Sequence, residues 1–249
     1  MPASVALRPL RLPHWRQVAL TAFTALSGLL AAAPHTTAQA QPAATVEAIG
    51  DAIVFTGQIN QQSAASFLRL LQDPGIRRLV ITSRGGIVTA SLDMAVAIHE
   101  RRLDIEVPTT CHSSCANYIF PAARQKIVGR PDAVAWHGNM THVMYLQQTG
   151  QATWSEEMIE SARQLAAREA QFYRRIGVDG FVCWFAKIAP YNMDDFYSLS
   201  VDDMRRFGMA NVSVRESSPP QADAGDVRQV QVDWAGLEAI RPAVRLAPS

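Results

Sequence analysis

The sequence predicts an α/β domain with a largely parallel sheet and an additional helical segment. Short apolar runs typical of strands alternate with segments of helical periodicity, in units of roughly 30 residues as in βαβ folds. The run 78–82, RLVIT, is apolar at its centre, as in a strand buried on both faces. A later stretch, from about residue 155 to 175, carries a long apolar stripe at helical spacing. At 249 residues, 48% of them hydrophobic, the chain can bury one domain and still carry appendages.

The elements follow one another in a regular order. The first predicted strand ends at Thr56-Gly57, and the helix after it stops at Asp73-Pro74-Gly75. A second strand leads through a glycine pair into a second helix, and a third strand leads through a serine turn into a third helix. The segment 138–151 is polar, and no element is predicted for it. The predicted strands are 52–55, 78–82, 105–107, 126–128 and 133–136, and the predicted helices lie near 61–71, 87–98, 115–122 and 155–175.

The first 40 residues have the pattern of a secretory signal peptide. Arg8, Arg11 and Arg16 precede an uncharged run of 16 residues, 18–33, and Ala38-Gln39-Ala40 forms a small-x-small cleavage site. A spanning helix needs about 20 apolar residues, so the run is short for an uncleaved anchor, which is the alternative. We therefore expect cleavage before Gln41 and a periplasmic or secreted protein with no membrane attachment after cleavage.

Composition divides the rest of the chain. A spacer rich in Ala, Pro and Gln is predicted at 41–50, the main domain at 51–212, a flexible linker at 213–229 and a C-terminal tail at 230–249. Residues 1–40 contain three of the 23 basic residues and none of the 22 acidic ones, so the mature chain has a net charge of −2. Such a balance gives no electrostatic footprint for nucleic acid.

Three cysteines are present, and export would place them in an oxidising compartment. The preferred disulfide is Cys111 with Cys115, which lie across a turn, while Cys183 stays free. A metal site built from these two cysteines and nearby histidines is the alternative, although no zinc-ligand spacing stands out and no metal or cofactor is expected. The histidines concerned are His112, His137 and His142.

Three chemically useful features fall just beyond the carboxyl ends of predicted strands, where ligands bind in parallel α/β sheets. They are the pair Gly85-Gly86, Ser114 and His137. Each also has an ordinary structural explanation: a tight turn for the glycines, a helix N-cap for Ser113 or Ser114, and a hydrogen-bonded strand end for the histidine. Together they supply a nucleophile, a base and oxyanion donors, which acyl transfer needs.

In these segments the sequence resembles the ClpP/crotonase superfamily, and within it the exported ClpP-like serine peptidases. The resemblance covers about residues 50–212 and is clearest from 79 to 138. Residues 83–90, SRGGIVTA, resemble the family's S-P-G-G-x-V-x-x-G segment with Arg84 in place of proline. Residues 114–120, SCANYIF, resemble its nucleophile helix S-M-G-A-F-L-L, residues 130–137 its histidine strand, and residues 57–60 its G-x-I-N turn.

The resemblance implies a role for each matching residue. Ser114 would be the nucleophile and His137 the general base, and the N–H groups of Gly86 and Cys115 would form the oxyanion hole. Ser113 is the competing nucleophile if the register shifts by one residue. The family's third triad member would fall at Phe196, so a one-residue shift makes Asp195 the predicted acid, with Asp194 as the alternative and two solvated turn acids as the structural explanation.

The leading functional hypothesis is an exported serine hydrolase of ClpP-like fold, a peptidase acting on a peptide or protein through an acyl-enzyme. A second hypothesis keeps the fold as a binding or scaffold protein without chemistry, since Arg84, Cys115 and the unplaced aspartate depart from the family pattern. A crotonase-type acyl-CoA enzyme is the third, and export argues against it. The resemblance also implies self-association into a homo-oligomer.

Overall fold

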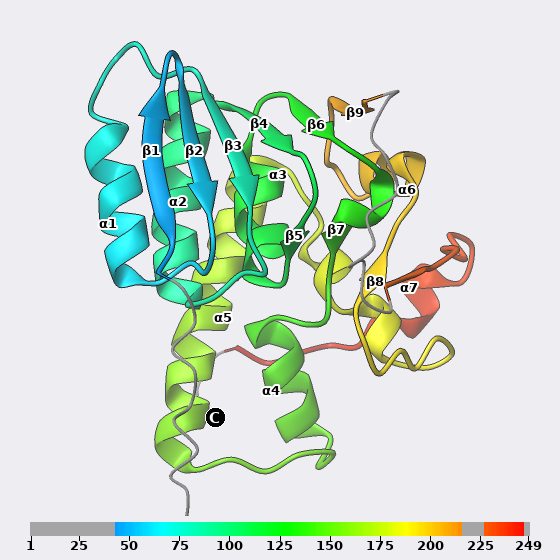
Figure 1. The fold of residues 1–249 in the computed structure, drawn as a ribbon. Helices are drawn as coiled ribbons and strands as arrows, with labels where there is room; N and C mark the ends of the chain where they lie inside the picture. The colour runs from blue at the N-terminus through cyan, green and yellow to red at the C-terminus, as the bar shows by residue number, and fades with distance from the viewer. Residues whose placement is uncertain (1–42, 216–226, 247–249) are drawn as a thin grey trace, which may run out of the picture. The chain divides into compact units, whose positions relative to one another are not determined.

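The structure is a computed structural model that describes residues 43–215 and 227–246 of the 249-residue chain. Within these ranges the chain has the predicted mixed α/β fold with a mostly parallel sheet (Figure 1). The predicted signal peptide, residues 1–40, lies outside the described residues. In the part of the chain that the structure describes, no helix has both the length and the apolar character needed to cross a membrane.

The main sheet has six strands in the order β1-β2-β3-β4-β6-β9. Neighbours from β2 to β9 pair in parallel, and β1 pairs antiparallel with β2. Residues 45–49, predicted to belong to a spacer, thus form an edge strand. The strands are β1 Thr45–Ile49, β2 Ala52–Thr56, β3 Arg78–Thr82, β4 Asp104–Val107, β6 Lys126–Val128 and β9 Val212–Val214.

Short parallel pairings extend the sheet at the carboxyl end of its strands. β5, Cys111–His112, pairs with β7, Val134–Ala135. Ser83, directly after β3, forms a single bridge with Cys111 at the start of β5. These pairings place the segments after β3, β5 and β7 next to one another, which brings the glycine pair, the serine turn and His137 to one place.

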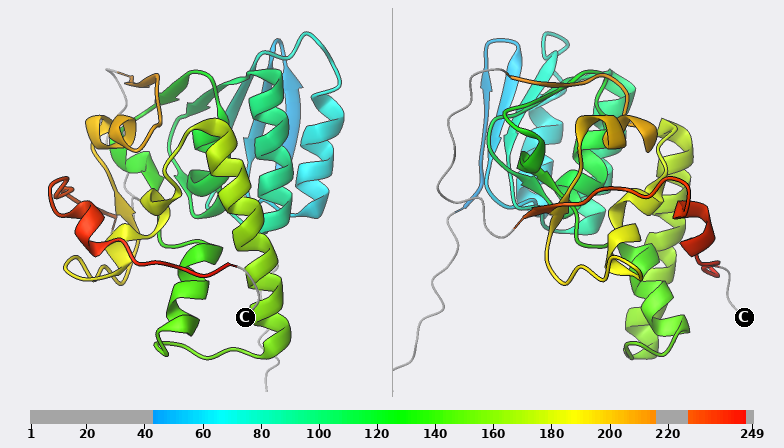
Figure 2. Two further views of the ribbon diagram at one scale, coloured as in Figure 1. Left: turned by 180° about the vertical axis from the view of Figure 1, so that it is seen from behind. Right: turned by 90° about the vertical axis from the view of Figure 1, so that its right-hand side faces the viewer.

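Two helices cover one face of the main sheet, α1, Gln61–Leu70, and α2, Val88–Arg101, and α5, Glu156–Ile176, packs on the outer side of α2 (Figures 1 and 2). α1 begins at a reciprocal cap in which the Asn60 side chain accepts from the Ser63 N–H at 2.9 Å and the Ser63 hydroxyl accepts from the Asn60 N–H at 2.9 Å. α5 begins at a Ser155 cap and ends at Gly177, whose φ of +70° is the left-handed conformation that glycine favours. Local capping therefore sets the start of α1 and both ends of α5.

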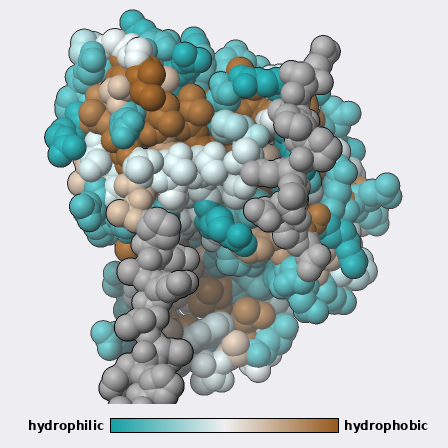
Figure 3. Space-filling model, viewed as in Figure 1, coloured by the Kyte–Doolittle hydropathy of each residue, from teal (hydrophilic) through white to brown (hydrophobic). Residues whose placement is uncertain are grey.

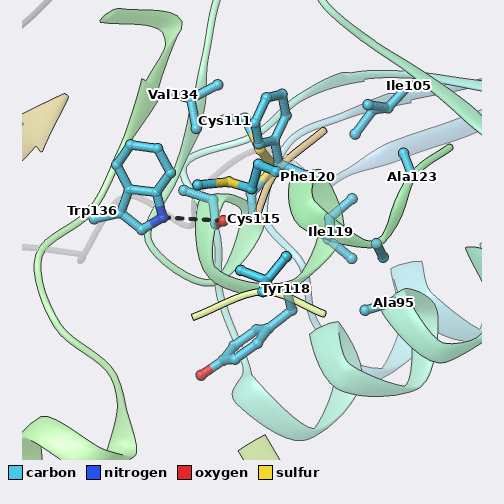
Figure 4. Packing of buried hydrophobic residues seen from close by; sticks show 14 of the residues in the cluster. Ala95, Ile105, Cys111, Cys115, Tyr118, Ile119, Phe120, Ala123, Val134 and Trp136 are labelled. Carbon is cyan, nitrogen blue, oxygen red and sulfur yellow. Dashed lines mark hydrogen bonds between the residues drawn. A yellow bond between two sulfur atoms is a disulfide. The ribbon is translucent and has the colours of Figure 1, made fainter. Parts of the chain in front are cut away.

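The core joins the sheet to the segments that carry the site. Trp136, directly after β7, is fully buried, and its indole N–H donates to the carbonyl of Ala116 at 3.2 Å (Figure 4). Ala116 lies in a π-helical turn, Cys115–Ile119, that continues into α3, Phe120–Ala122. Tyr118 and Phe120 of this segment are also fully buried. Packing around Trp136 thus holds the strand before His137 against the helix after the serine turn.

The opposite face of the main sheet is partly open. Val54, Val80 and Ile127 lie in one row across β2, β3 and β6, with Glu106 of β4 between the last two. Figure 3 shows hydrophobic side chains gathered over the β1–β3 part of this face. Arg215 crosses toward β4 and pairs with Glu106 at 2.7 Å.

A helix that the sequence does not predict follows His137. α4, Met140–Gln148, lies in the segment 138–151 and packs against α5. Asn139 caps it by accepting from the His142 N–H at 3.0 Å. Its apolar residues are spread around the helix and give no clear period, and tertiary packing through Met144 on Ile159, Ala162 and Ala166 stabilises it.

The C-terminal residues dock on the fold. β10, Arg228–Gln229, pairs in parallel with β8, Tyr197–Ser198. The Trp234 indole lies against Phe207, with ring centroids 4.7 Å apart, after α6, Val201–Arg206. Beyond α7, Leu237–Ile240, the backbone N–H and C=O of Arg245 both bond to the Gln148 side chain of α4, at 3.1 and 2.6 Å.

Candidate functional site

The glycine pair after β3 makes a tight passage beside the segment before α1. Gly86 has a φ of +153°, and a Cβ there would lie 1.9 Å from the carbonyl oxygen of Ile59. The two segments are joined by hydrogen bonds from Ile59 N–H to the Gly85 carbonyl at 2.9 Å and from Ile87 N–H to the Ile59 carbonyl at 2.8 Å. Only a residue without a side chain fits this passage, which aims the Gly86 N–H at the serine turn.

The serine turn is bounded by a disulfide. Cys111 in β5 and Cys115 in the helical turn are bridged, with their Cα atoms 5.1 Å apart, as the spacing predicts. Ser113 between them has a φ of +56°, a left-handed conformation that is uncommon for residues other than glycine. Such conformations cluster at functional sites, where the surrounding structure holds them. Because both cysteines are bridged, they are not ligands for a metal in this structure.

Ser114, the predicted nucleophile, faces the glycine pair. Its hydroxyl accepts from the Gly86 N–H at 2.8 Å and donates to the Gly86 carbonyl at 3.1 Å. The residue is only 2% exposed. Ser114 therefore lies next to the Gly86 N–H, one of the two predicted oxyanion donors, but its hydroxyl proton is already engaged by the backbone.

His137 bonds to the neighbouring serine instead. The Nε2 atom of His137 lies 2.7 Å from the Ser113 hydroxyl, which is half-buried. The histidine follows β7, and the next residue is fixed because the Asn117 side chain donates to the Gly138 carbonyl at 2.9 Å. The structure thus brings together both serines, Gly86, Cys115 and His137, and it joins the base to Ser113 rather than to Ser114.

The surroundings favour the neutral form of the histidine. Burial among protein atoms lowers the pKa of His137 from its usual 6.5, and the positive charge of Lys187 lowers it further. At pH 7 the ring is therefore mostly uncharged, and Nε2 can accept a proton when the other ring nitrogen carries one. The ring thus meets the requirement for a general base.

The predicted acid does not reach this histidine. The ring of Phe196 lies edge-on against His137, with centroids 4.4 Å apart, and also lies 5.2 Å from the His112 ring. Asp194 and Asp195 lie in the preceding loop, where their backbone carbonyls accept from Lys187 Nζ at 2.6 and 3.4 Å. In the described residues no hydrogen bond joins either carboxylate to His137, so neither Asp195 nor its alternative Asp194 acts as an orienting acid in this geometry.

We expect Asp195→Asn to leave the titration of His137 almost unchanged. A carboxylate that paired with the imidazole would raise its pKa, and losing it would lower the pKa by about a unit or more. With Phe196 against the ring, the shift should stay below about 0.3 units. NMR titration of the histidine side chains measures it, with Asp194→Asn as the matched control. A large downward shift in the Asp195 variant would show that the loop brings this acid to the ring in solution.

A cavity of about 160 Å³ opens beside the two serines and His137. Its apolar lining comes from Val88, Tyr118, Met140 and Val143 and its polar lining includes Asn117 and His142. Among the described residues no cluster of three or more His, Cys, Asp or Glu side chains could hold a metal ion. The cavity can accommodate a small, mainly apolar group next to the Ser113 hydroxyl.

Sequence reasoning missed two contributors to this site. Asn117 follows the two serines by about one helical turn, and its amide holds the strand end after His137. Glu169 sits in the middle of the long helix, fully buried, although the periodicity predicts an ordinary apolar stripe there. A glutamate at helical spacing from Ala166, Phe172 and Tyr173, and so on the apolar face of the helix, is the signal that could have marked it.

No family model matches the chain, and comparison with curated proteins gives no match either. Among solved structures, an Asn-to-Asp mutant of ClpP1 from Listeria monocytogenes is 19% identical, over 67% of this chain and 92% of that one, with a TM-score of 0.35. A mutant of the membrane-bound stomatin-specific protease 1510-N is 13% identical, over 67% and 78% of the two chains, with a TM-score of 0.42. Both TM-scores lie below 0.5.

Proposed function

We propose that the chain is an exported serine hydrolase, a peptidase of ClpP-like fold, with Ser113 as the nucleophile and His137 as the general base. The 2.7 Å contact between the Ser113 hydroxyl and His137 Nε2 carries this proposal. A nucleophile and a base within hydrogen-bond reach are the first geometric requirement of acyl transfer. The left-handed backbone at Ser113 and its position at the mouth of the cavity support the same assignment.

The reaction follows from these positions. His137 takes the hydroxyl proton as the Ser113 oxygen attacks the carbonyl carbon of a peptide bond, and negative charge develops on the carbonyl oxygen. Ser114 begins a helix, where the first N–H groups lack intrahelical acceptors, so its N–H can stabilise this charge together with the N–H of Gly86. The imidazolium returns the proton to the leaving amine, and water then hydrolyses the acyl-enzyme with His137 again as base.

Ser114 is the competing nucleophile. Its contact with the Gly86 N–H fits a hydroxyl at the edge of an oxyanion hole. To react, however, the Ser114 hydroxyl would have to leave the Gly86 carbonyl and displace Ser113 from His137. In the Ser113 mechanism the Ser114 hydroxyl occupies the place beside the Gly86 N–H only in the free protein. When substrate binds, this hydroxyl turns away and the carbonyl oxygen of the substrate takes its place.

Export and a peptide substrate belong to the same proposal. The signal-like leader and the Cys111–Cys115 disulfide support an oxidising compartment outside the cytoplasm. The missing acid favours the alternative of a catalytically silent binding protein, because Phe196 rather than a carboxylate lies against the histidine. A serine and histidine without the acid can still react, at a lower rate, since the acid chiefly orients the imidazole.

The test is fluorophosphonate labelling of the full-length chain, expressed with its own leader and purified in its exported form. We expect the parent and Ser114→Ala to label and Ser113→Ala to lose labelling, because only the latter removes the hydroxyl bonded to His137. The mass of the product also reports whether cleavage occurs before Gln41. The opposite pattern would make Ser114 the nucleophile, and a folded parent that does not label between about pH 6 and 9 would overturn the hydrolase in favour of the binding protein.

A further inference from the structure

One carboxylate is completely enclosed by the fold close to the site. Glu169, in the middle of α5, has no exposed surface. Its Oε1 accepts from the Tyr118 hydroxyl and from the Met140 N–H at 3.1 Å. Its Oε2 accepts from the N–H and the hydroxyl of Thr141, at 3.2 and 3.3 Å. Four donors around one carboxylate meet the condition under which a buried acid is tolerated.

The donors come from the two segments that carry the reacting groups. Tyr118 belongs to the π-helical turn that begins directly after Ser114. Met140 and Thr141 form the first turn of α4, which starts just after His137. Between these segments, the Asn117 side chain bonds to the Gly138 carbonyl, and the Tyr173 hydroxyl of α5 donates to the Asn117 carbonyl at 3.0 Å. The long helix α5 thus connects the segment that carries the two serines to the segment that follows His137.

We infer that Glu169 is a positioning residue, which sets the spacing of Ser113 and His137 by clamping the serine helix to the first turn of α4. The inference rests on the proposed function and extends it to a residue that touches neither substrate nor reacting atoms. Because the usual acid is absent from His137, this clamp takes over part of the task of fixing where the base stands. It does so through the backbone of residues 138–141, not through a contact with the imidazole.

The charge on Glu169 governs how well the clamp holds. Burial raises its pKa from 4.5 to about 7, although its four donors favour the ionised form. The titratable groups that face it are Tyr118, Tyr173 and Cys183, whose own pKa values are all raised by burial, so they remain neutral near pH 7. The positive end of α4 favours the carboxylate.

Protonation therefore weakens the clamp near neutral pH. A protonated carboxyl group carries a hydrogen on one oxygen and must donate it. Each oxygen of Glu169 faces a backbone N–H, which cannot accept, so either one N–H contact is lost or the hydroxyl of Tyr118 or Thr141 must rotate to accept the proton. As the pH falls, Glu169 takes up a proton near pH 7 and loses its charge. His137 takes up its proton at a lower pH, because its pKa lies below 6.5. The labelling rate should therefore rise in two steps with pH, one for His137 and a second near pH 7 for Glu169.

The experiment compares the pH dependence of the labelling rate in the parent, Glu169→Gln and Glu160→Gln from about pH 5.5 to 8.5. We expect Glu169→Gln to lose the step near pH 7, keep the lower step and label about tenfold more slowly above pH 7, within the range that small misplacements cost. Glu160 is an exposed residue of the same helix, so its variant should match the parent. If Glu169→Gln does not fold, Tyr118→Phe removes a single donor and should lower the plateau while the step remains.

Hydrogen exchange of the amides of residues 139–142 supplies a readout that needs no activity. Corrected for intrinsic rates, exchange in the parent should slow as the pH rises through 7, and it should not do so in Glu169→Gln. If the parent never labels but the exchange behaves in this way, the hydrolase proposal fails and the clamp stands. If the parent labels with the same pH profile and exchange behaviour as Glu169→Gln, the clamp is overturned and Glu169 is a packing residue only.

Discussion

Replacing His137 with alanine is expected to slow fluorophosphonate labelling by about a thousandfold, within the range of a general base. The ring is the group within hydrogen-bond distance of the Ser113 hydroxyl, at 2.7 Å, and its lowered pKa keeps it neutral at pH 7. In the parent, labelling should fall as the pH drops through this pKa, below 6.5, because the imidazolium cannot accept a proton. Second-order labelling rates measured on folded protein test both statements.

His142→Ala is the matched control for this effect. His142 lines the same cavity and its ring stacks on Trp184 with centroids 5.6 Å apart, but no hydrogen bond joins it to either serine. We expect its loss to change the rate by less than about tenfold, as an indirect effect of packing. Equal losses in the two variants would show that the His137 contact has no special role.

Gly86→Ala should remove most of the labelling and also destabilise the fold. The added Cβ would lie 1.9 Å from the Ile59 carbonyl oxygen, so the passage between the two segments must open. That movement breaks their hydrogen bonds and displaces the Gly86 N–H from the site, which costs about 10²–10³ in rate when an oxyanion donor is lost. We expect the free energy of unfolding to fall by about 2–4 kcal/mol, as for a steric clash with backbone.

Gly150→Ala separates the clash from backbone strain. Gly150 also has a positive φ, +70°, but a Cβ there meets no atom within 4 Å. Its substitution should cost about 1–2 kcal/mol, the strain of the left-handed conformation alone, and leave the labelling rate unchanged. Chemical denaturation and labelling of the two variants measure the difference. A parent-like rate for folded Gly86→Ala would remove Gly86 from the oxyanion hole.

The sequence predicted the sheet and its principal helices because local signals agree with the fold. The apolar strand 78–82 lies where the structure has it, and the helices predicted near 61–71 and 155–175 are α1, which ends before residues 73–75, and α5. The edge strand β1 and the helix α4 were not predicted. Both depend on tertiary pairing, with β2 and with α5, and their own sequences carry a weak period.

The sequence predicted which segments form the site, but not which of their side chains contact one another. The strand ends placed Gly86, the serines and His137 together, since parallel pairing dictates this. Which serine meets the histidine depends on the left-handed backbone at Ser113, and periodicity does not report such a turn. The unshifted resemblance places the third triad position at Phe196, and Phe196 is the side chain beside His137, where it packs on two histidine rings. The one-residue shift that makes Asp195 the acid is therefore absent from this geometry.

Because a disulfide encloses the serine turn, the properties of a sample depend on how much of the protein has this bond oxidised. Cys111 and Cys115 enclose both serines, so a molecule in which this bond is reduced has the same sequence but a turn held by fewer constraints. A preparation can then contain an oxidised and a reduced population. If the proposed hydrolase labels with fluorophosphonate, the labelled amount should follow the oxidised fraction, counted by thiol titration with the buried Cys183 as the internal reference, and not the total concentration of protein.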